Sequence, residues 1–215
     1  MNAPALDLAG IRKDYALKTL DESQVQGDPL AQFREWMAEA IAAKVPEPTA
    51  MNVATVDARG RPAGRVCLLK ELDAKGFVFY TNYGSRKGRE LAERPVAALT
   101  FFWKELERQV RIEGAVEQVS AADSDAYYRQ RPLGSRIGAW ASPQSEPMPD
   151  RKWLEARWES LAQQHGDDPP RPAHWGGYRV IPDYFEFWQG RSSRLHDRIA
   201  YALAGGSWRI SRLAP

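Results

Sequence analysis

The sequence predicts a mainly β fold with peripheral helices, in which the strands form a closed or nearly closed barrel. The first observation is a run of short apolar segments joined by tight turns, at residues 50–56, 64–72 and 77–81, which is typical of an antiparallel meander. The second is the number of further strand-like segments, at residues 96–103, 109–119, 178–181, 184–188, 195–203 and 208–213. This number of strands favours a barrel.

The first helix is predicted to begin at Asp28 and Pro29, which suit the N-cap and the first helical position. Pro46 and Pro48 end it. Its apolar residues recur at helical spacing, so we expect them to pack on the core. They are Leu30, Phe33, Trp36, Met37, Ala40 and Ile41.

Four further helices follow from capping residues and apolar spacing. Ser85 is a good N-cap for a helix that runs to about residue 93, and Ser120 begins another that stops at Pro132. A short helix is expected at residues 137–142, and a longer one from about Trp153 to Gly166.

Composition bounds the class of protein. A chain of 215 residues suits one sizeable domain, and we expect residues 1–26 to form a flexible arm and residues 27–215 a single domain. Thirty basic residues against 28 acidic ones give a net charge of +2, which does not suggest a nucleic-acid partner. Cys67 is the one cysteine, which fits a reducing compartment. With no secretory signal and no apolar run long enough for a membrane helix, we expect a soluble, cytoplasmic protein.

A first phosphate site is predicted at the start of the helix after Ser85. Arg86 and Lys87 occupy its first turn, where positive charge has the wrong sign for the helix dipole. An anion held by the free backbone N–H groups and the two cations would explain this placement. The alternative is a solvated basic turn, which proteins tolerate.

A second phosphate site is predicted around the end of the helix that Ser120 begins. Tyr127 and Arg131 are four residues apart and are expected to face the same way, and Ser135 follows shortly after. Two hydroxyls and a guanidinium suit phosphate. The alternative is an amphipathic helix with an ordinary solvated face.

The segment from Trp188 to Arg198 is too polar for a core strand. Arg194, His196 and Arg198 are spaced by two, so an extended chain would point all three to one face. Three such groups repel one another unless an anion or an electron-rich ring lies among them. The alternative is a solvated sheet face in which Asp197 neutralises a neighbour.

Some further residues carry weaker signals. Arg65 and Lys70 stand at the two ends of an apolar run, and their spacing of five places them on opposite faces of a regular strand. The Gln109 amide can both donate and accept hydrogen bonds, which alone is a weak signal for a ligand contact. Cys67 is interpreted as a small core residue. The three histidines are too dispersed for metal ligands, so no metal site is expected.

Several motifs, in sequence order, resemble the pyridoxamine 5'-phosphate oxidase family, and together they run from about Arg12 to the last residue. They are residues 65–70, 79–82, 85–87, 107–111, 137–140, 144–145, 187–190, 194–198 and 212–215. The sequence departs from the family pattern at Cys67, where an aliphatic residue is more usual, and in a short segment before Arg12.

The resemblance implies an FMN-binding split β-barrel that works as a homodimer, with FMN at the subunit interface. It implies FMN contacts at Arg65, Tyr80, Thr81, Arg86, Lys87, Gln109, Gln144, Ser145, Trp188 and Arg198. It implies substrate contacts at Arg12, Tyr15, Lys70, Tyr127, Arg131, Ser135, Arg194 and His196. Arg12 and Tyr15 would belong to an arm that closes over the substrate; from the residues alone, the same segment is a solvated tail.

The activity implied is oxidation of pyridoxamine or pyridoxine 5'-phosphate to pyridoxal 5'-phosphate. In that reaction FMN N5 accepts a hydride, and dioxygen reoxidises the flavin to give hydrogen peroxide. Arg194 and His196 are the implied catalytic residues, over the substrate ring and at its hydroxyl. The alternatives are another split-barrel flavoprotein (a reductase or a non-catalytic flavin-binding protein) and a barrel that binds single-stranded nucleic acid.

Overall fold

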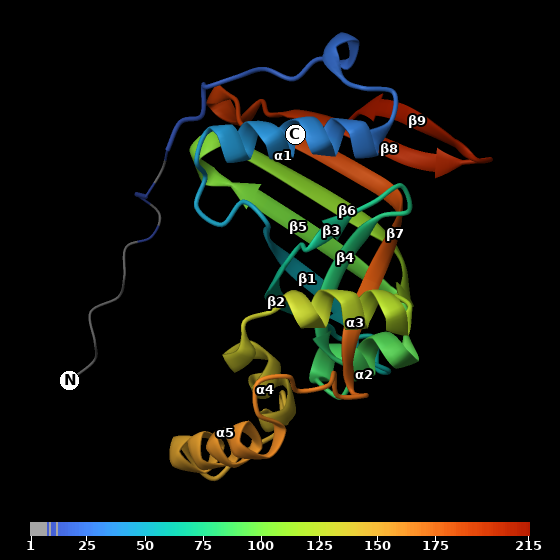
Figure 1. The fold of residues 1–215 in the computed structure, drawn as a ribbon. Coiled ribbons are helices and arrows are strands. Elements are labelled where there is room, and N and C mark those ends of the chain that lie inside the picture. The colour runs from blue at the N-terminus through green and yellow to red at the C-terminus, as the bar shows by residue number, and fades with distance from the viewer. Residues whose placement is uncertain (1–7, 9, 12) are drawn as a thin grey trace. The chain divides into compact units, whose positions relative to one another are not determined.

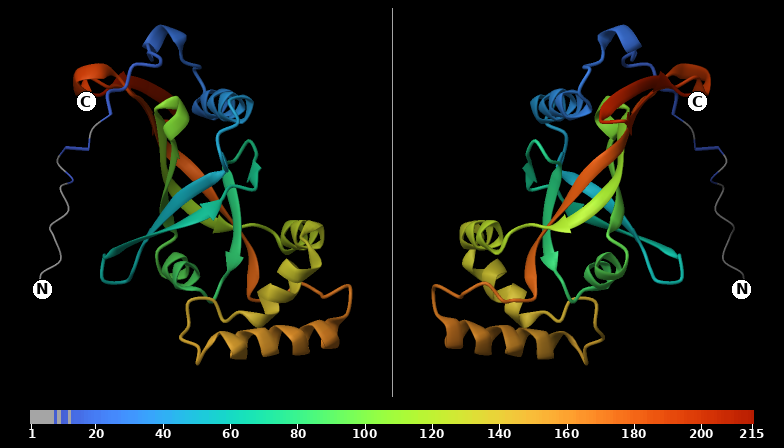
Figure 2. Two further views of the ribbon diagram at one scale, coloured as in Figure 1. Left: turned by 90° about the vertical axis from the view of Figure 1, so that its left-hand side faces the viewer. Right: turned by 90° about the vertical axis from the view of Figure 1, so that its right-hand side faces the viewer.

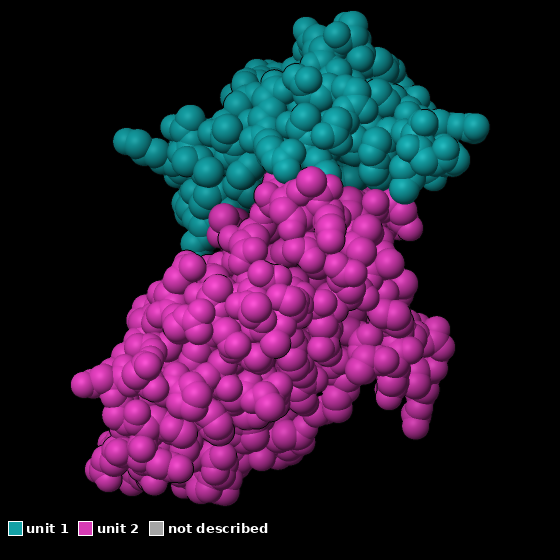
Figure 3. Space-filling view, turned by 45° about the vertical axis from the view of Figure 1, so that its right-hand side comes forward, with its two compact units in different colours: residues 1–48, 102–110, 185–215 teal, residues 49–101, 111–184 magenta. Residues whose placement is uncertain are grey.

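The structure is a computed structural model that describes residues 8, 10–11 and 13–215. It comprises two compact units, coloured separately in Figure 3. Unit 1 consists of the chain up to residue 48 with residues 102–110 and 185–215, and unit 2 of residues 49–101 and 111–184. Three strands, β5, β6 and β7, have residues in both units. The division into a flexible arm and a single domain stays a prediction.

Unit 2 holds most of the sheet and four helices (Figure 1). Its strands are β1 (Ala50–Val56), β2 (Pro62–Leu68), β3 (Glu71–Leu72), β4 (Phe77–Asn82), and most of β5 (Val96–Trp103), β6 (Arg108–Gln118) and β7 (Trp175–Gln189). Its helices are α2 (Arg86–Glu93), α3 (Ala121–Gln130), α4 (Leu133–Ala141) and α5 (Arg151–His165).

The sheet curls because the strands at the two ends of its order, β2 and β3, follow one another in the chain. The strand order is β2-β1-β5-β6-β7-β4-β3, so β2 and β3 lie at opposite ends of the order. Only Leu69 and Lys70 separate them: the Leu69 N–H donates to the carbonyl of Thr49, and the Lys70 N–H donates to that of Val78, both at 2.9 Å. The chain therefore passes from one end of the order to the other in two residues. The two views of Figure 2 show the strands of this unit wrapping round.

The core of unit 2 is made by the inward residues of these strands. Fully buried side chains include Val53, Phe77, Phe79, Leu99, Phe101, Ile112 and Val180. The rings of Phe77 and Phe101 lie 6.5 Å apart, a normal distance for a packed aromatic pair. Alternation of buried and exposed residues along β5 and β6 is that of strands with one covered face. The predicted mainly β fold with peripheral helices is confirmed.

Unit 1 is built around α1 (Pro29–Ala42) and the hairpin of β8 (Asp197–Ala204) and β9 (Ser207–Arg212). It also holds three short 3-10 turns, η1 (Glu22–Gln24), η2 (Lys104–Leu106) and η3 (Ser192–Arg194). Trp36 packs edge to face on Phe187, and the guanidinium of Arg108 lies 4.2 Å from the Trp36 ring. Arg108 is buried, and Glu39 and Gln189 accept its hydrogen bonds.

The predicted helix starts are confirmed at the cap residues. The side chains of Asp28, Ser85 and Ser120 each accept a backbone N–H from the first turn of α1, α2 and α3. In the stripe of α1, Phe33, Trp36 and Ala40 are buried, but Ile41 is exposed. The helix expected at residues 137–142 begins earlier, at Leu133, because Pro132 ends α3 and serves as the N-cap of α4.

Three strand predictions were wrong, the first two because of a long-range partner and the third because of a local turn. The segment 64–72 is two strands, since the chain changes partner at Leu69. The segments 178–181 and 184–188 are one strand, β7. Its pairing with β4 ends at Val180, so the missing N–H of Pro182 breaks no bond with that neighbour. The strand predicted at residues 195–203 begins later, at Asp197 in β8, because Ser193 and Arg194 have positive φ of 56° and 60° in the turn at η3.

Gly114 in β6 gives a direct test of this packing. A Cβ built there would lie 2.0 Å from the carbonyl oxygen of Ile181 in β7, so we expect Gly114→Ala to cost about 1–3 kcal/mol of unfolding free energy. Gly138→Ala is the matched control, because its Cβ meets nothing within 4 Å and lies in α4, where alanine is favoured over glycine. Urea denaturation measures both. Equal stability of the two variants would contradict the close approach of β6 and β7.

Candidate functional site

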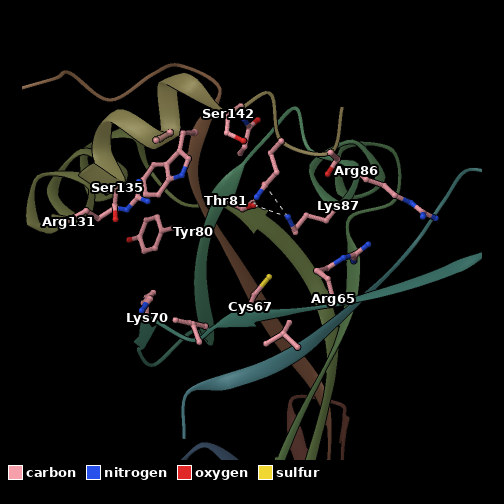
Figure 4. Close-up of a pocket in the computed structure, with 18 of the residues that line it drawn as sticks. Arg65, Cys67, Lys70, Tyr80, Thr81, Arg86, Lys87, Arg131, Ser135 and Ser142 are labelled. Carbon is pink, nitrogen blue, oxygen red and sulfur yellow. Dashed lines mark hydrogen bonds between the residues drawn. The ribbon is translucent and has the colours of Figure 1, made fainter. Parts of the chain in front are cut away.

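A cavity of about 970 Å³ lies in unit 2, between β2, β4, the start of α2, and the segment that includes α3 and α4 (Figure 4). Many of the side chains predicted from the sequence line it. They are Arg65, Lys70, Tyr80, Thr81, Arg86, Lys87, Tyr127, Arg131, Ser135, Gln144 and Ser145. Arg65 and Lys70 were expected on opposite faces, but the break after β2 brings both to this one cavity.

The lining is strongly one-sided in charge. Of the described residues that line the cavity, five are arginine or lysine and none is aspartate or glutamate. Arg65, Arg86 and Lys87 gather on one side in Figure 4, and Lys70 and Arg131 on the other. Cations confined together without a carboxylate repel one another, so the cavity is suited to an anionic ligand.

Lys87 is a buried cation at the start of α2. Its Nζ donates to Thr81 Oγ1 at 3.1 Å, and to Ser85 Oγ and Gln144 Oε1 at 3.3 Å each. All three acceptors are neutral. Burial therefore lowers the pKa of Lys87 from its ordinary value, because the charged form loses water without gaining a carboxylate at hydrogen-bond distance.

Glu90, which was not predicted as a site residue, bonds two of the predicted cations and is itself outside the cavity lining. It is buried in α2; its Oε1 accepts from Arg86 Nε at 2.8 Å and its Oε2 from an Arg65 nitrogen at 3.1 Å. Thr55 also donates to it. Burial raises the pKa of Glu90, but the hydrogen bonds from Thr55, Arg86 and Arg65 outweigh burial and hold it below its usual value. The i, i+4 spacing of Arg86 and Glu90 was the available signal.

Aromatic rings line the side of the cavity near Arg131. Tyr80 stacks on Tyr127 with ring centroids 3.9 Å apart, and Trp175 is nearly parallel to both. The Tyr80 hydroxyl donates to Glu71 at 2.6 Å, which fixes the direction of the ring. Trp175 was not predicted as a site residue. Its Trp-Gly-Gly context was the only signal, and it is uninformative alone.

Arg131 carries an unused donor in this cavity. Its guanidinium lies 4.5 Å from the Trp175 ring, and its buried Nη1 has no hydrogen-bond partner in the part of the chain that the structure describes. Burial lowers the pKa of Arg131 from its ordinary value. A buried guanidinium donor without an acceptor is costly, so a ligand oxygen there would be favourable.

The other predicted residues lie in unit 1. Tyr15, Trp188 and His196 form an aromatic cluster in which the Trp188 and His196 rings are 4.6 Å apart. Tyr15, Arg194 and His196 line a second cavity of about 420 Å³. Gln109 is half-buried in β6. Arg12 lies outside the described residues.

His196 and Arg198 are held by hydrogen bonds. The Arg191 N–H donates to His196 Nδ1 at 3.1 Å, so a neutral His196 carries its proton on Nε2. Arg198 donates to both carboxylate oxygens of Glu186, at 2.9 and 3.0 Å. The prediction that Arg194, His196 and Arg198 share one face was wrong, because the turn at η3 precedes β8.

Within residues 8, 10–11 and 13–215, no three His, Cys, Asp or Glu side chains are grouped so that they could hold a metal ion. In the same residues no helix is long and apolar enough to cross a membrane.

Comparison with known proteins identifies the family. The model of a family described as pyridoxamine 5'-phosphate oxidase matches residues 37–165, and one described as the pyridoxine 5'-phosphate oxidase C-terminal dimerisation region matches residues 175–215. A pyridoxine/pyridoxamine 5'-phosphate oxidase of Cupriavidus pinatubonensis is 59% identical over 209 residues, which cover 97% of this chain and 99% of that protein. The chain belongs to the pyridoxamine 5'-phosphate oxidase family. The oxidase of that name from Burkholderia multivorans is also 59% identical, with the same coverage.

Solved structures agree with membership of the pyridoxamine 5'-phosphate oxidase family. PhzG from Burkholderia lata, in complex with tetrahydrophenazine-1-carboxylic acid, superposes with a TM-score of 0.88 at 33% identity, covering 93% of this chain and all of that one. A pyridoxamine 5'-phosphate oxidase-related, FMN binding protein from Nostoc punctiforme has a TM-score of 0.68 at 18% identity, covering 85% of this chain and 97% of that one. The fold is thus a split β-barrel, as the resemblance implied.

The alkylation rate of Cys67 tests the structure of this cavity without a ligand. Its half-buried thiol lines the cavity; burial raises its pKa, and the positive charges of Lys87 and Arg65 offset only part of the rise. Because the thiolate is the reactive form, we expect iodoacetamide at pH 8 to alkylate Cys67 more slowly in the folded protein than in urea. The folded-state rate should continue to rise at pH values where the unfolded rate has levelled off. Mass spectrometry measures both rates; identical pH profiles would contradict the raised pKa.

Proposed function

We propose that the protein is an FMN-dependent oxidase that converts pyridoxamine 5'-phosphate or pyridoxine 5'-phosphate to pyridoxal 5'-phosphate, with dioxygen reduced to hydrogen peroxide. It would serve the biosynthesis and salvage of pyridoxal 5'-phosphate. The observation that carries the proposal is the unit 2 cavity: its described lining residues include five cations, on two sides, and no carboxylate. Two separate cationic sides suit a ligand pair with two phosphates, one on the cofactor and one on the substrate.

The residues at the start of α2 fit the FMN phosphate. Within the described residues, the buried Lys87 donates its hydrogen bonds to neutral oxygens. Arg86 bonds Glu90 through Nε, so its two terminal guanidinium nitrogens can donate to a phosphate. Arg65 is held beside them by the same carboxylate. We expect Tyr80, Thr81, Gln144 and Ser145 to contact the rest of the cofactor. When bound, FMN supplies the hydride acceptor and the reaction with dioxygen.

The other side of the cavity fits the substrate phosphate. The unpartnered Arg131 Nη1 lacks an acceptor that a phosphate oxygen would provide. Lys70 adds a second cation, and Tyr127 and Ser135 add hydroxyl donors on the same cavity wall. Binding the phosphate would fix the position of the ring and reduce the entropy lost on reaching the reactive arrangement.

Arg194 and His196 would act on the substrate ring. Because Nδ1 of His196 accepts the Arg191 N–H, its Nε2–H can donate to the ring hydroxyl of the substrate and orient the ring. Arg194 lines the same cavity of unit 1 and would lie over the ring through its planar guanidinium. Gln109, Trp188 and Arg198 would complete the cofactor contacts, and Arg12 and Tyr15 those to the substrate.

We propose a homodimer with FMN at the subunit interface. The match of residues 175–215 to a region described as a dimerisation region supports this assembly.

A second candidate is a flavoprotein acting on a ring without phosphate, suggested by the similarity to PhzG in complex with a tricyclic acid. The substrate-phosphate residues Lys70, Tyr127, Arg131 and Ser135 favour the phosphorylated substrate. The identities also favour it, at 59% for the oxidases and 33% for PhzG.

The experiment that tests the function is the visible spectrum of the purified protein without oxygen, before and after addition of pyridoxamine 5'-phosphate. A flavin spectrum that bleaches and recovers in air, with one hydrogen peroxide formed per turnover, is expected. A flavin spectrum that bleaches with neither phosphorylated substrate would reject the oxidase proposal but keep the flavin site. A colourless protein that binds no added FMN would reject both.

Arg86→Ala should weaken FMN retention. The variant loses a charge-assisted hydrogen bond to phosphate, worth about 1.5–3 kcal/mol, so we expect roughly tenfold to hundredfold weaker binding of FMN. Quenching of flavin fluorescence during titration of the apoprotein measures the affinity. Arg89→Ala is the matched control, because Arg89 is in the same helix but bonds Gly84 and Glu146 and does not line the cavity. Unchanged FMN affinity in Arg86→Ala would exclude this phosphate site.

Arg194→Leu should separate turnover from cofactor binding. Since Arg194 is proposed to position the substrate ring, its loss should lower kcat by about a hundredfold and leave FMN affinity nearly unchanged. Arg209→Leu, an exposed arginine of β9, is the control. Steady-state kinetics and FMN titration on the same preparations give the comparison; equal losses of kcat and FMN affinity would contradict the assigned role.

A further inference from the structure

Glu107 is a buried acidic residue for which neither the fold nor the proposed chemistry gives a reason. It follows η2 and precedes β6, with its backbone in the left-handed region at φ 54°. Its side chain is only 3% exposed. A buried carboxylate is costly unless donors surround it, so its partners indicate its role.

The partners of the Glu107 carboxylate all come from one short segment far away in sequence. Oε2 accepts the backbone N–H of Ala16 at 2.9 Å and that of Leu17 at 3.1 Å, and Oε1 pairs with Lys13 Nζ at 3.1 Å. Within the described residues, these hydrogen bonds and this ion pair are the ones the carboxylate makes. Burial raises the pKa of Glu107, but the bonds from Leu17, Lys13 and Ala16 outweigh burial and lower it, so the group is ionised at neutral pH.

The backbone carbonyl of Glu107 bonds residues 189 and 190, and Gly190 contacts the same segment at Tyr15. Its carbonyl accepts the Gly190 N–H at 2.8 Å and the Gln189 side-chain amide at 3.2 Å. Gly190 in turn packs closely against Tyr15, since a Cβ at residue 190 would be 2.7 Å from Tyr15 Cβ. One residue therefore holds both residues 13–17 and the start of the loop that carries Arg194 and His196.

Tyr15 takes its position from this arrangement. Its ring packs edge to face on Trp188, with centroids 5.8 Å apart, and lies 6.2 Å from the ring of His196. It lines the 420 Å³ cavity with Arg194 and His196. Residues 13–17 form no helix or strand. Side-chain contacts and the Glu107 carboxylate must therefore hold them in place.

We propose that Glu107 is a positioning residue: its carboxylate anchors residues 13–17 and thereby holds Tyr15 at the cavity of Arg194 and His196. Glu107 touches neither cavity itself. What Tyr15 does there rests on the proposed function, but the anchoring does not. Loss of the anchor releases the segment while the core of unit 1 keeps its packing, because the carboxylate bonds none of the aromatic core residues.

The direct test is limited proteolysis with trypsin, followed by mass spectrometry, on the full-length protein. Lys18 directly follows the anchored residues 13–17, so trypsin can cleave after it only when this part of the chain detaches from the folded protein. Glu107→Leu removes all three interactions, and we expect cleavage at Lys18 to become at least about tenfold faster, from the loss of two charge-assisted hydrogen bonds. Glu107→Gln keeps an acceptor oxygen but loses the charge, and it should give an intermediate rate.

The control is Glu105→Gln, the same change at an exposed residue two positions earlier in η2. A urea unfolding curve for every variant separates release of the segment from global destabilisation. Faster cleavage in both Glu107 variants at an unchanged unfolding midpoint, with Glu105→Gln like wild type, supports the anchor. Wild-type cleavage rates in Glu107→Leu and Glu107→Gln, or equal acceleration in Glu105→Gln, overturn it.

Steady-state kinetics test whether loss of the anchor also weakens substrate binding. In Glu107→Gln, the KM for pyridoxamine 5'-phosphate should rise about fivefold or more, while the affinity for FMN stays that of wild type. An unchanged KM with accelerated proteolysis overturns the link from the anchor to the substrate cavity. If the wild-type protein oxidises neither phosphorylated substrate, the proposed function fails, and the proteolysis still decides whether Glu107 holds the segment.

Discussion

The change of partner at Leu69 and Lys70 is the constraint on which unit 2 depends. Two adjacent N–H groups donate to Thr49 beside β1 and to Val78 in β4, the strands next to the two ends of the sheet order. The crossing ends β2 at Leu68, which keeps this edge strand of the sheet order short. With it, the sheet curls, and residues from β2 and β4 share one cavity. The cationic lining is therefore a consequence of topology as well as of sequence.

The same cavity shows how an anion site is prepared before its ligand arrives. Lys87 is buried against neutral oxygens and its pKa is lowered, so its charge costs stability in the free protein. Glu90 holds two arginines in place, but it lies behind them and does not line the cavity. The positive potential thus stays directed into the cavity, and an anion that binds only the folded protein recovers the cost as added stability. Preorganised cations need little rearrangement when a phosphate binds.

Features set by neighbours in sequence could be predicted, and features set by distant partners could not. Asp28, Ser85 and Ser120 were read correctly because an N-cap bonds residues of its own first turn. The break after Leu68 and the continuity of β7 through Pro182 depend on which strand lies alongside. The turn at Ser193 depends on positive φ at two residues that are not glycine, which the sequence does not indicate. Most of the candidate site came from the family resemblance, which the comparisons confirm at the level of the family. Trp175 was missed because its partner Arg131 lies elsewhere in the chain, and for Glu90 the i, i+4 spacing from Arg86 gave no sign of the second partner, Arg65.

Net charge is a poor guide to such a site because it averages over pairs that cancel. Some cations outside the cavity are matched by carboxylates: Arg179 pairs with Asp73 and Glu117, and Arg212 pairs with Glu22 and Asp197. Charges paired in this way cancel in the balance between 30 basic and 28 acidic residues, yet ion pairs exposed to solvent contribute little to stability. Within the described residues, the cavity cations Lys70, Lys87 and Arg131 form no ion pair, whereas Arg65 and Arg86 share Glu90, which is outside the cavity lining. A chain that is almost neutral overall therefore holds a concentrated positive charge where a small dianion fits, and its balanced surface disfavours a large polyanion such as nucleic acid.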